Sequence, residues 1–174
     1  MVLIAPAQPE DAPAIAAVHV AAWRAAYAGI VPQVVLDSLS EVQRTAQWRR
    51  ILAAEAGWTL VARDGGRMAP VVGFVQGCAL RDADAAPGDG EVGGLYLRPD
   101  RRGHGLGRAL MAAAVKRLAA EGMAQLFVWV LADNRPARAF YAHLGGVPDR
   151  TQYDTIGGRR LREVRYRWDA LPRL

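Results

Sequence analysis

A glycine-rich turn between two regular segments is the stretch of this sequence best suited to chemistry. Arg102–Gly107 (RGHGLG) follows a short apolar run, Glu91–Leu97, and precedes an Ala/Leu-rich helical segment, Arg108–Ala120. Glycines leave backbone N–H groups free to converge on an anion, and the start of a helix adds partial positive charge. Basic side chains surround the turn at Arg98, Arg101, Arg102 and Arg108. The pattern therefore indicates a phosphate-binding site.

The spacing of the glycines excludes two familiar phosphate loops. A P-loop requires Gly-x-x-x-x-Gly-Lys followed by Ser or Thr, whereas Arg108-Ala109 follows the last glycine here. A dinucleotide fingerprint requires Gly-x-Gly-x-x-Gly, and Gly103, Gly105 and Gly107 are spaced differently. What remains is Arg-x-x-Gly-x-Gly after a strand.

Further segments give this loop a context. The strand before the loop ends with Leu95-Tyr96-Leu97-Arg98-Pro99, and an apolar strand, Leu126–Leu131, follows the helix. The next segment, Asn134–Gly146, has the form Asn-x-x-Ala-x-x-Phe-Tyr-x-x-x-Gly. The loop, the two strands and the Asn segment, in this order, resemble the motifs of the GCN5-related N-acetyltransferase (GNAT) superfamily. Trp23–Pro32 is similar to the helix–loop opening of one broad bacterial branch. The resemblance extends over nearly the whole chain.

The resemblance implies acetyl-CoA as the cosubstrate. In this family the N–H groups of the loop bind the pyrophosphate, and the main chain of the preceding strand pairs with the pantetheine arm like an extra strand. The cofactor-binding positions carried over are Leu95, Tyr96, Leu97, Arg102, Gly103, His104, Gly105, Leu106, Gly107, Arg108 and Asn134. Gly93-Gly94 fits a bulge that would open a slot for the arm, although the pair could also mark close packing of a helix.

Asn134 and Tyr141 each allow a structural and a functional interpretation. Asn134 before Arg135-Pro136 is a suitable N-cap, and in the family the matching Asn also bonds the CoA arm. Tyr141 lies at helical spacing from Ala137 and Leu144, which indicates a core stripe. The family assigns the matching tyrosine as the general acid that returns a proton to the CoA sulfur. The spacing of Tyr141 from Asn134 matches the family's Asn segment, and this match favours Tyr141 as the catalytic acid.

Glu91 is the candidate general base, because a carboxylate at the start of the strand that bears the slot could activate the amine directly or through a water. A surface acid at a strand end is an equally good interpretation. Other candidates are Asp154 and Glu163 near the C-terminus, and His19, for which a buried, hydrogen-bonded role is the commoner outcome.

Aromatic residues in the first third of the chain could line an acceptor pocket. Trp23 and Tyr27 are i, i+4 neighbours on one helix face, and Tyr27 lies just before the break at Gly29, which favours pocket lining. Trp48 and Trp58 are more typical of core packing.

The elements that must position these residues follow from periodicity and turn signals. The expected order is β-α-α-β-β-β-α-β-α-β-β, with Ser40 and Gln43 forming a capping-box pattern for a helix through about Glu55. The last two strands, Thr151–Ile156 and Leu161–Trp168, form a hairpin around Gly157-Gly158. The fold class is therefore α/β (α+β): a mixed, mostly antiparallel sheet flanked by helices. The resemblance implies a splayed central parallel pair formed by the strands at Glu91 and Leu126.

Size and composition limit the classes of function. The 174 residues, 52% hydrophobic and 22% charged, predict one domain spanning 1–174. The single cysteine, Cys78, excludes a disulfide or a cysteine-based zinc site within the chain. The start has no basic n-region and no apolar run is long enough to span a membrane, so a cytoplasmic location is expected. The charge of +5 rests almost entirely on scattered arginines, which argues against nucleic-acid binding.

The sequence thus predicts an acetyl-CoA-dependent N-acetyltransferase that acylates a primary amine on a small molecule or a peptide. The alternative is a non-catalytic acyl-CoA-binding regulatory module, against which the retention of Tyr141 argues. The expected partners are acetyl-CoA and an amine acceptor, and a homodimer is compatible with the chain. No metal is expected.

Overall fold

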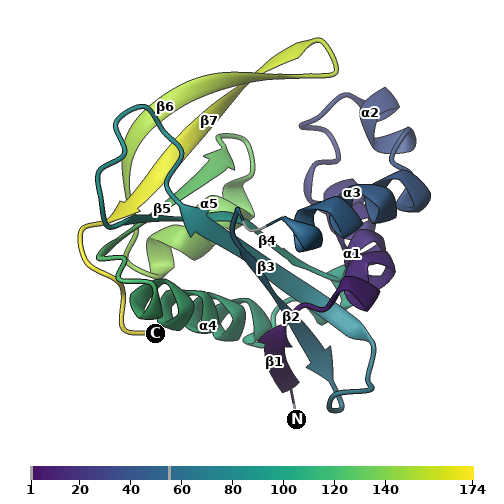
Figure 1. Ribbon diagram of the computed structural model, residues 1–174. Coiled ribbons are helices and arrows are strands. Elements are labelled where there is room, and N and C mark those ends of the chain that lie inside the picture. Colours follow the sequence, from purple (N-terminus) through teal and green to yellow (C-terminus); the bar gives the residue numbers. More distant parts are fainter. Residues whose placement is uncertain (1, 55) are drawn as a thin grey trace.

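A seven-stranded mixed sheet organises the chain in the computed structural model, which describes residues 2–54 and 56–174 (Figure 1). The strand order is β1-β2-β3-β4-β5-β7-β6. The strands are β1 (Val2–Pro6), β2 (Trp58–Asp64), β3 (Val71–Ala79), β4 (Asp89–Leu97), β5 (Gln125–Leu131), β6 (Val147–Ile156) and β7 (Arg159–Trp168). The α-helices are α1 (Ala12–Ala26), α2 (Gln33–Asp37), α3 (Glu41–Ala53), α4 (Leu106–Ala120) and α5 (Arg135–His143). Every strand pairing is antiparallel except that of β4 with β5, so the predicted fold class is confirmed.

Most element boundaries agree with the expected ones, and the differences have simple causes. The short helix α2 was not predicted, because five residues after Pro32 are too few to show a helical period. The hairpin strands β6 and β7 extend beyond their predicted starts, because main-chain pairing continues through exposed polar residues. Ser40 caps α3 by accepting from the Gln43 N–H, as predicted, and α3 ends at Ala53; the predicted end, Glu55, lies outside the described residues.

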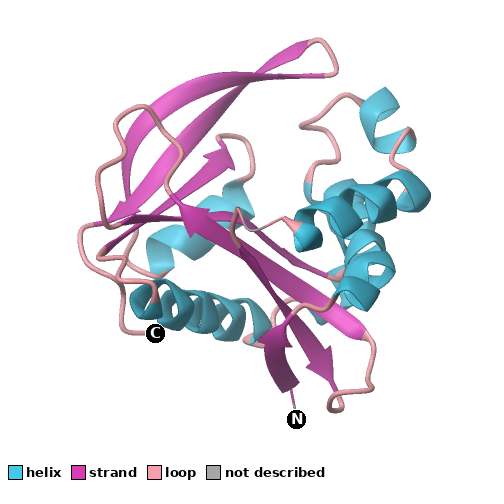
Figure 2. Cartoon of the chain, in the orientation of Figure 1, coloured by secondary structure: helices cyan, strands magenta, loops and turns pink. Residues whose placement is uncertain are grey.

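Helices cover both faces of the sheet (Figure 2). On one face α4 and α5 pack over the central strands, and their apolar side chains form the main core with β5 and β7. On the other face α1 and α3 pack against β2 and β3 around Ile15, Trp48 and Phe74. The glycine turn and the Asn segment, which begin α4 and α5, are thereby brought to the same region of the sheet.

The parallel pair β4 and β5 separates after a short contact. Only Asp89, Gly90 and Glu91 pair with β5, at Gln125–Phe127. The register of β3 against β4 shifts at the same point, since Gly77 pairs with Val92 and Gln76 with Gly94. Gly93 is therefore the extra residue of a bulge, which bends β4 away from β5. The gap between the strands begins where the bulge lies, as the glycine pair predicted.

A third apolar cluster joins distant segments beyond this gap. Val31 and Leu36, around α2, pack against Leu131 at the end of β5 and Leu161 of β7. The Arg159 guanidinium also donates to the Ile30 carbonyl at 3.2 Å. These contacts connect the loop after α1 with the β6–β7 hairpin, and in Figure 1 the tip of the hairpin extends toward α2. No helix in the described part of the chain is both long and apolar enough to cross a membrane.

Candidate active site

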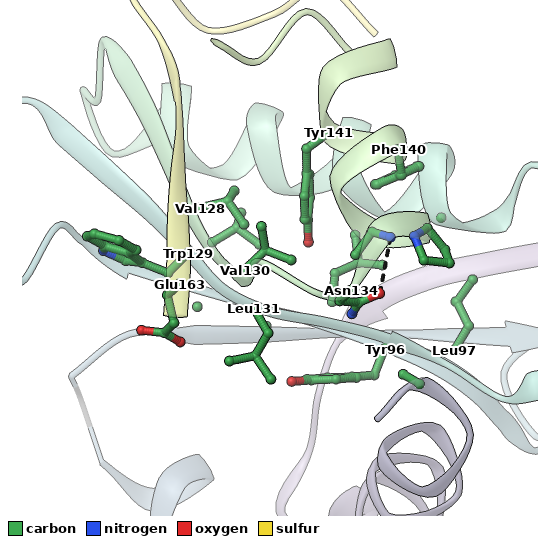
Figure 3. A pocket seen from close by; sticks show the side chains of 18 of the residues that line it. Tyr96, Leu97, Val128, Trp129, Val130, Leu131, Asn134, Phe140, Tyr141 and Glu163 are labelled. Atoms are coloured by element: carbon green, nitrogen blue, oxygen red, sulfur yellow. Dashed lines mark hydrogen bonds between the residues drawn. The ribbon is translucent and has the colours of Figure 1, made fainter. Parts of the chain in front are cut away.

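One cavity of about 1140 Å³ connects the glycine turn, the gap between β4 and β5, and the inner face of the hairpin. Its walls come from α1, β4, β5, the starts of α4 and α5, and the β6–β7 hairpin. Figure 3 shows side chains from these elements pointing into a common space.

The glycine turn presents unused backbone donors at one end of the cavity. Gly105 is the N-cap of α4 with a φ of 76°, and no side chain caps the helix. The N–H groups of Leu106, Gly107 and Arg108 have no helical acceptor, because they belong to the first turn. A Cβ added at Gly103 or Gly105 would meet no described atom within 4 Å, so the space above the turn is open.

The predicted residues of this turn do not all contribute side chains. Arg102 and Arg108 line the cavity together with the three glycines. The side chain of Leu106 is buried in the core, so that residue offers only its N–H group. His104 is exposed and its side chain does not line the cavity.

The main chain of β4 faces the gap at two of the predicted positions. The Arg98 N–H donates to the Val72 carbonyl at 2.9 Å, which makes this a hydrogen-bonded pair of the β3–β4 ladder. Because such pairs alternate in antiparallel sheets, the main-chain groups of Leu95 and Leu97 point away from β3 and into the gap. The main chain of Tyr96 is turned toward β3 instead, and this residue contributes its side chain to the cavity.

Asn134 lies where the gap meets the start of α5. Its Oδ1 accepts from the Ala137 N–H at 3.3 Å, so the predicted N-cap is confirmed. The residue is only 7% exposed and lines the cavity. Its Nδ2 has no hydrogen-bond partner among the described residues, and Figure 3 shows it directed into the cavity. The side chain therefore caps the helix with one atom and leaves the other available.

Tyr141 is both a core residue and a cavity residue. It is 6% exposed, and its ring packs near Phe140, Tyr166 and Trp168. Its hydroxyl points out of this packing into the cavity, toward the side where Tyr96 lies, without a partner among the described residues (Figure 3). Burial raises the pKa of Tyr141, so the hydroxyl keeps its proton throughout the neutral range.

Glu91 lies at the bulge, is 5% exposed and lines the cavity. Both of its carboxylate oxygens accept from the Arg81 guanidinium, at 2.8 and 3.1 Å. No feature of the sequence indicated this bidentate pair. Glu91 is therefore positioned as predicted but is not a free carboxylate, and its role as base would have to be exercised within the ion pair or through a water.

Two tyrosine hydroxyls meet on the α1 side of the cavity. The Tyr27 and Tyr96 oxygens are 3.3 Å apart, and burial raises the pKa of both phenols. Trp23 packs edge-on against Tyr27, and both residues line the cavity. Trp23 of α1 and its C-cap residue Tyr27 therefore both line the cavity, and their place in an acceptor pocket stays a prediction.

The other aromatic candidates lie elsewhere. Trp48 is buried under α1 and donates to His19 Nδ1 at 3.1 Å, while Trp58 donates to Glu121 at 3.0 Å. His19 stacks on Tyr96, and burial lowers its pKa to about 3, with Arg44 contributing. A neutral histidine that accepts from Trp48 and does not line the cavity is a packing residue, so the structure argues against His19 as the base.

Glu163 and Asp154, the remaining candidate bases, line the hairpin end of the cavity. Glu163 is half-buried on β7, and its Oε2 accepts from Gln152 Nε2 at 2.8 Å. Burial raises the pKa of Glu163, and the negative charges of Asp154 and Asp82 add to the effect. Asp154 is exposed at the rim and accepts from the Thr155 N–H at 2.7 Å.

Trp129 is a wall residue that the sequence did not reveal, because its strand reads simply as apolar. It lines the cavity, and its indole N–H donates to Asp82, which is held in turn by Arg165 at 2.7 Å. Arg165 is 4% exposed and also binds Asp84 and Asp149. This buried arginine fixes the loop before β4 against the hairpin and so orients Trp129.

A mixed sheet with a splayed parallel pair, and a glycine turn that starts a helix beside the gap, defines an acyl-CoA-type acyltransferase fold. The model of the Acetyltransferase (GNAT) family matches residues 20–145, and the chain belongs to this family. The uncharacterized N-acetyltransferase YuaI of Bacillus subtilis (strain 168) is 34% identical over 176 aligned positions, covering 100% of this chain and 96% of YuaI.

Solved structures share the fold at lower identity. The PaiA N-acetyltransferase of Thermoplasma acidophilum, in complex with coenzyme A, has a TM-score of 0.70 and 21% identity, covering 94% of this chain and 98% of its own. YncA of Salmonella typhimurium, with its cofactor acetyl-CoA, has a TM-score of 0.72 and 19% identity, covering 100% of this chain and 96% of its own.

Among the described residues, no three His, Cys, Asp or Glu side chains are grouped as metal ligands would be.

Proposed function

We propose that this protein is an acetyl-CoA-dependent N-acetyltransferase that acylates a primary amine by direct attack. The single observation that carries the proposal is the continuity of the cavity, which joins a phosphate-type turn, a strand gap and an acidic, aromatic end. Membership of the GNAT family and the presence of CoA or acetyl-CoA in structural neighbours support the same reading.

The residues present fit acetyl-CoA. The uncapped start of α4, with open space above Gly103 and Gly105, suits a pyrophosphate, and Arg102 and Arg108 supply positive charge beside it. The outward-facing main chain of Leu95 and Leu97 suits the amide groups of pantetheine. The unpartnered Nδ2 of Asn134 offers a donor to the same arm. The acetyl-CoA thioester supplies the activated acyl group.

The chain's own residues would then move protons during the transfer. The amine nitrogen bonds to the acetyl carbonyl carbon, and the carbon–sulfur bond breaks with its electron pair on sulfur. We assign the proton lost by the attacking ammonium to Glu91, through a water because Arg81 occupies its carboxylate. We assign the proton received by the departing thiolate to the Tyr141 hydroxyl, which regains a proton from the second one that the nitrogen loses once the carbon–nitrogen bond has formed.

The rival function is binding of acyl-CoA without turnover, and one assay separates the two. Purified protein is incubated with acetyl-CoA and a panel of primary amines, and release of free thiol is followed together with formation of the N-acetyl product. We expect amine-dependent thiol release with one amide formed per thiol. Tight binding of acetyl-CoA in calorimetry, without thiol release for any amine, would establish the binding module instead.

A further inference from the structure

The hairpin end of the cavity holds carboxylates that the protein leaves without a cation. Among the acids that line the cavity, Glu91 is paired with Arg81 and Asp82 with Arg165. Glu163 and Asp154 have no ion pair with a described residue, and their contacts are an amide and a backbone N–H. This is notable in a chain of 22 basic residues and net charge +5.

Neighbouring arginines do not neutralise these acids, for two reasons. Arg159 and Arg165, on the same face of the hairpin, contact the Ile30 carbonyl and other carboxylates instead, and two further arginines face away. Glu163 pairs with Gln152, and Asp154 with Leu161, so both acids project from the same face of the hairpin, toward the cavity. Side chains alternate between faces along a strand. Arg160 and Arg162 therefore project from the opposite face, where Arg160 stacks on Tyr153 at 3.9 Å.

The two carboxylates are diagonal neighbours on one face of the hairpin. Their charges repel, since the negative charge of Asp154 adds to the effect of burial in raising the pKa of Glu163. The half-buried Glu163 also has less solvent to screen it, consistent with the raised pKa that its burial causes. A cationic group between them would remove both penalties.

The same cavity contains an independent sign of a ligand. Tyr141 is 94% buried, yet its hydroxyl faces the cavity without a described partner, which places the reacting end there (Figure 3). Trp129, Leu131 and Ile156 line the wall toward the two acids. The cavity thus offers, in sequence, a reacting centre, an apolar wall and an anionic end.

We propose that the acceptor is an amine carrying a second positive charge, such as a diamine, and that Glu163 and Asp154 bind the cationic group that is not acetylated. This proposal rests on the proposed function, since it names the class of amine that the same site accepts. An apolar spacer would lie along Trp129 and Leu131. An acceptor with a carboxylate in place of the second ammonium would meet two like charges and be rejected.

The test compares three probes of equal chain length: 1,4-diaminobutane, n-butylamine and 4-aminobutanoate. We expect kcat/KM to be highest for 1,4-diaminobutane, by about 10-fold or more over n-butylamine, as a charge-assisted contact gives. We expect 4-aminobutanoate to be the poorest. Equal use of 1,4-diaminobutane and n-butylamine by the wild-type protein would overturn the proposal.

The variants Glu163→Gln and Asp154→Asn locate the effect. Each should lower the ratio of kcat/KM for 1,4-diaminobutane to kcat/KM for n-butylamine toward one, with acetyl-CoA affinity unchanged. Asp169→Asn is the matched control, because this exposed acid follows β7 and pairs with Arg167 outside the cavity. If both variants still use 1,4-diaminobutane in preference to n-butylamine as strongly as the wild-type protein does, the assignment is overturned.

Failure of this proposal is distinguishable from failure of the proposed function. Thiol release with n-butylamine and 4-aminobutanoate as readily as with 1,4-diaminobutane would leave the acetyltransferase intact and remove only the diamine assignment. If Glu163→Gln does not fold, as its thermal melting curve would show, the exposed Asp154→Asn still decides the outcome.

Discussion

Tyr141 is a packing residue whose hydroxyl is also placed for the proposed chemistry. Its helical spacing from Ala137 and Leu144 places the ring in the core, and the structure confirms that burial. The hydroxyl extends beyond the ring into the cavity, where Asn134 and Tyr96 also lie. Because the oxygen makes no contact that the fold requires, its removal tests chemistry with little effect on packing.

We predict that Tyr141→Phe lowers kcat by about 10²-fold, the lower end of general-acid effects. The ring remains in place, so acetyl-CoA affinity and the melting temperature should change little. Stopped-time thiol release gives kcat, and calorimetry gives the affinity. An unchanged kcat would restrict Tyr141 to the core and leave water as the proton donor.

Glu91 is a more demanding case, since its carboxylate is bound by Arg81. An alkylammonium has an ordinary pKa near 10.4, so a base matters most near neutral pH. We predict that Glu91→Gln reduces kcat/KM by about 10²-fold near pH 7, the low end of general-base effects, and less at high pH, where free amine is abundant. The pH–rate profiles of both proteins are compared on one amine.

Arg81→Gln is the matched variant for this experiment. It breaks the same ion pair but leaves the carboxylate at the bulge, so it measures the contribution of the pair alone. A loss in Glu91→Gln that is uniform across pH would indicate a binding role. No loss would move the base to a bound water or to the hairpin acids.

The proposed phosphate-binding role of the turn before α4 requires positions without bulky side chains. Gly107 lies in the first turn, and a Cβ there would be 3.5 Å from the Phe140 ring, an ordinary contact. We predict that Gly107→Val folds but weakens acetyl-CoA binding about 10-fold or more, because its larger side chain intrudes where charge-assisted bonds to phosphate would form. Titration calorimetry measures the affinity, and wild-type affinity would refute the phosphate role of the turn.

Gly122, just beyond the other end of α4, provides a control for backbone strain. Gly105 and Gly122 flank α4 with φ values of 76° and 77°, and a Cβ at either would meet no described atom within 4 Å. Replacing either by alanine should therefore cost similar stability. Only Gly105→Ala should also weaken acetyl-CoA binding, because Gly122 lies at the far end of the helix.

The stability of the molecule as a whole should depend on pH through His19, which does not line the cavity. His19 has an ordinary pKa of 6.5, which burial lowers to about 3 in the folded protein. Between these values the unfolded chain binds more protons, so the free energy of unfolding rises with pH in that window. The contribution of His19 is complete above 6.5 and is lost as the pH falls toward 3.

We predict that His19→Gln reduces the dependence of the melting temperature on pH between about 4 and 7. At neutral pH the variant should lose roughly 1–3 kcal/mol, typical of a buried substitution, because the stacking on Tyr96 is gone while the amide can still accept from Trp48. His104→Gln, at an exposed position, serves as control. Parallel melting curves against pH for wild type and His19→Gln would contradict this account.

Much of the fold was predictable because local patterns agree with tertiary structure. The turn at Arg102–Gly107, the N-caps at Ser40 and Asn134, and the hairpin around Gly157-Gly158 are set by residues close in sequence. The Gly93-Gly94 pair predicted the bulge, because glycine inside a strand is typical of one, and the register shift confirms it. The short helix α2 was not predicted, because five residues are too few to show a helical period.

The sequence by itself determined the order of elements, the phosphate-type turn and the chemical candidates, because each depends on residue types at short spacing. Only the tertiary structure decided which candidates share a cavity. It paired Glu91 with Arg81, buried His19 against Trp48, and left Glu163 and Asp154 without a cation. These outcomes depend on contacts between distant segments and on strand register, and neither is encoded in the spacing of residues along the chain.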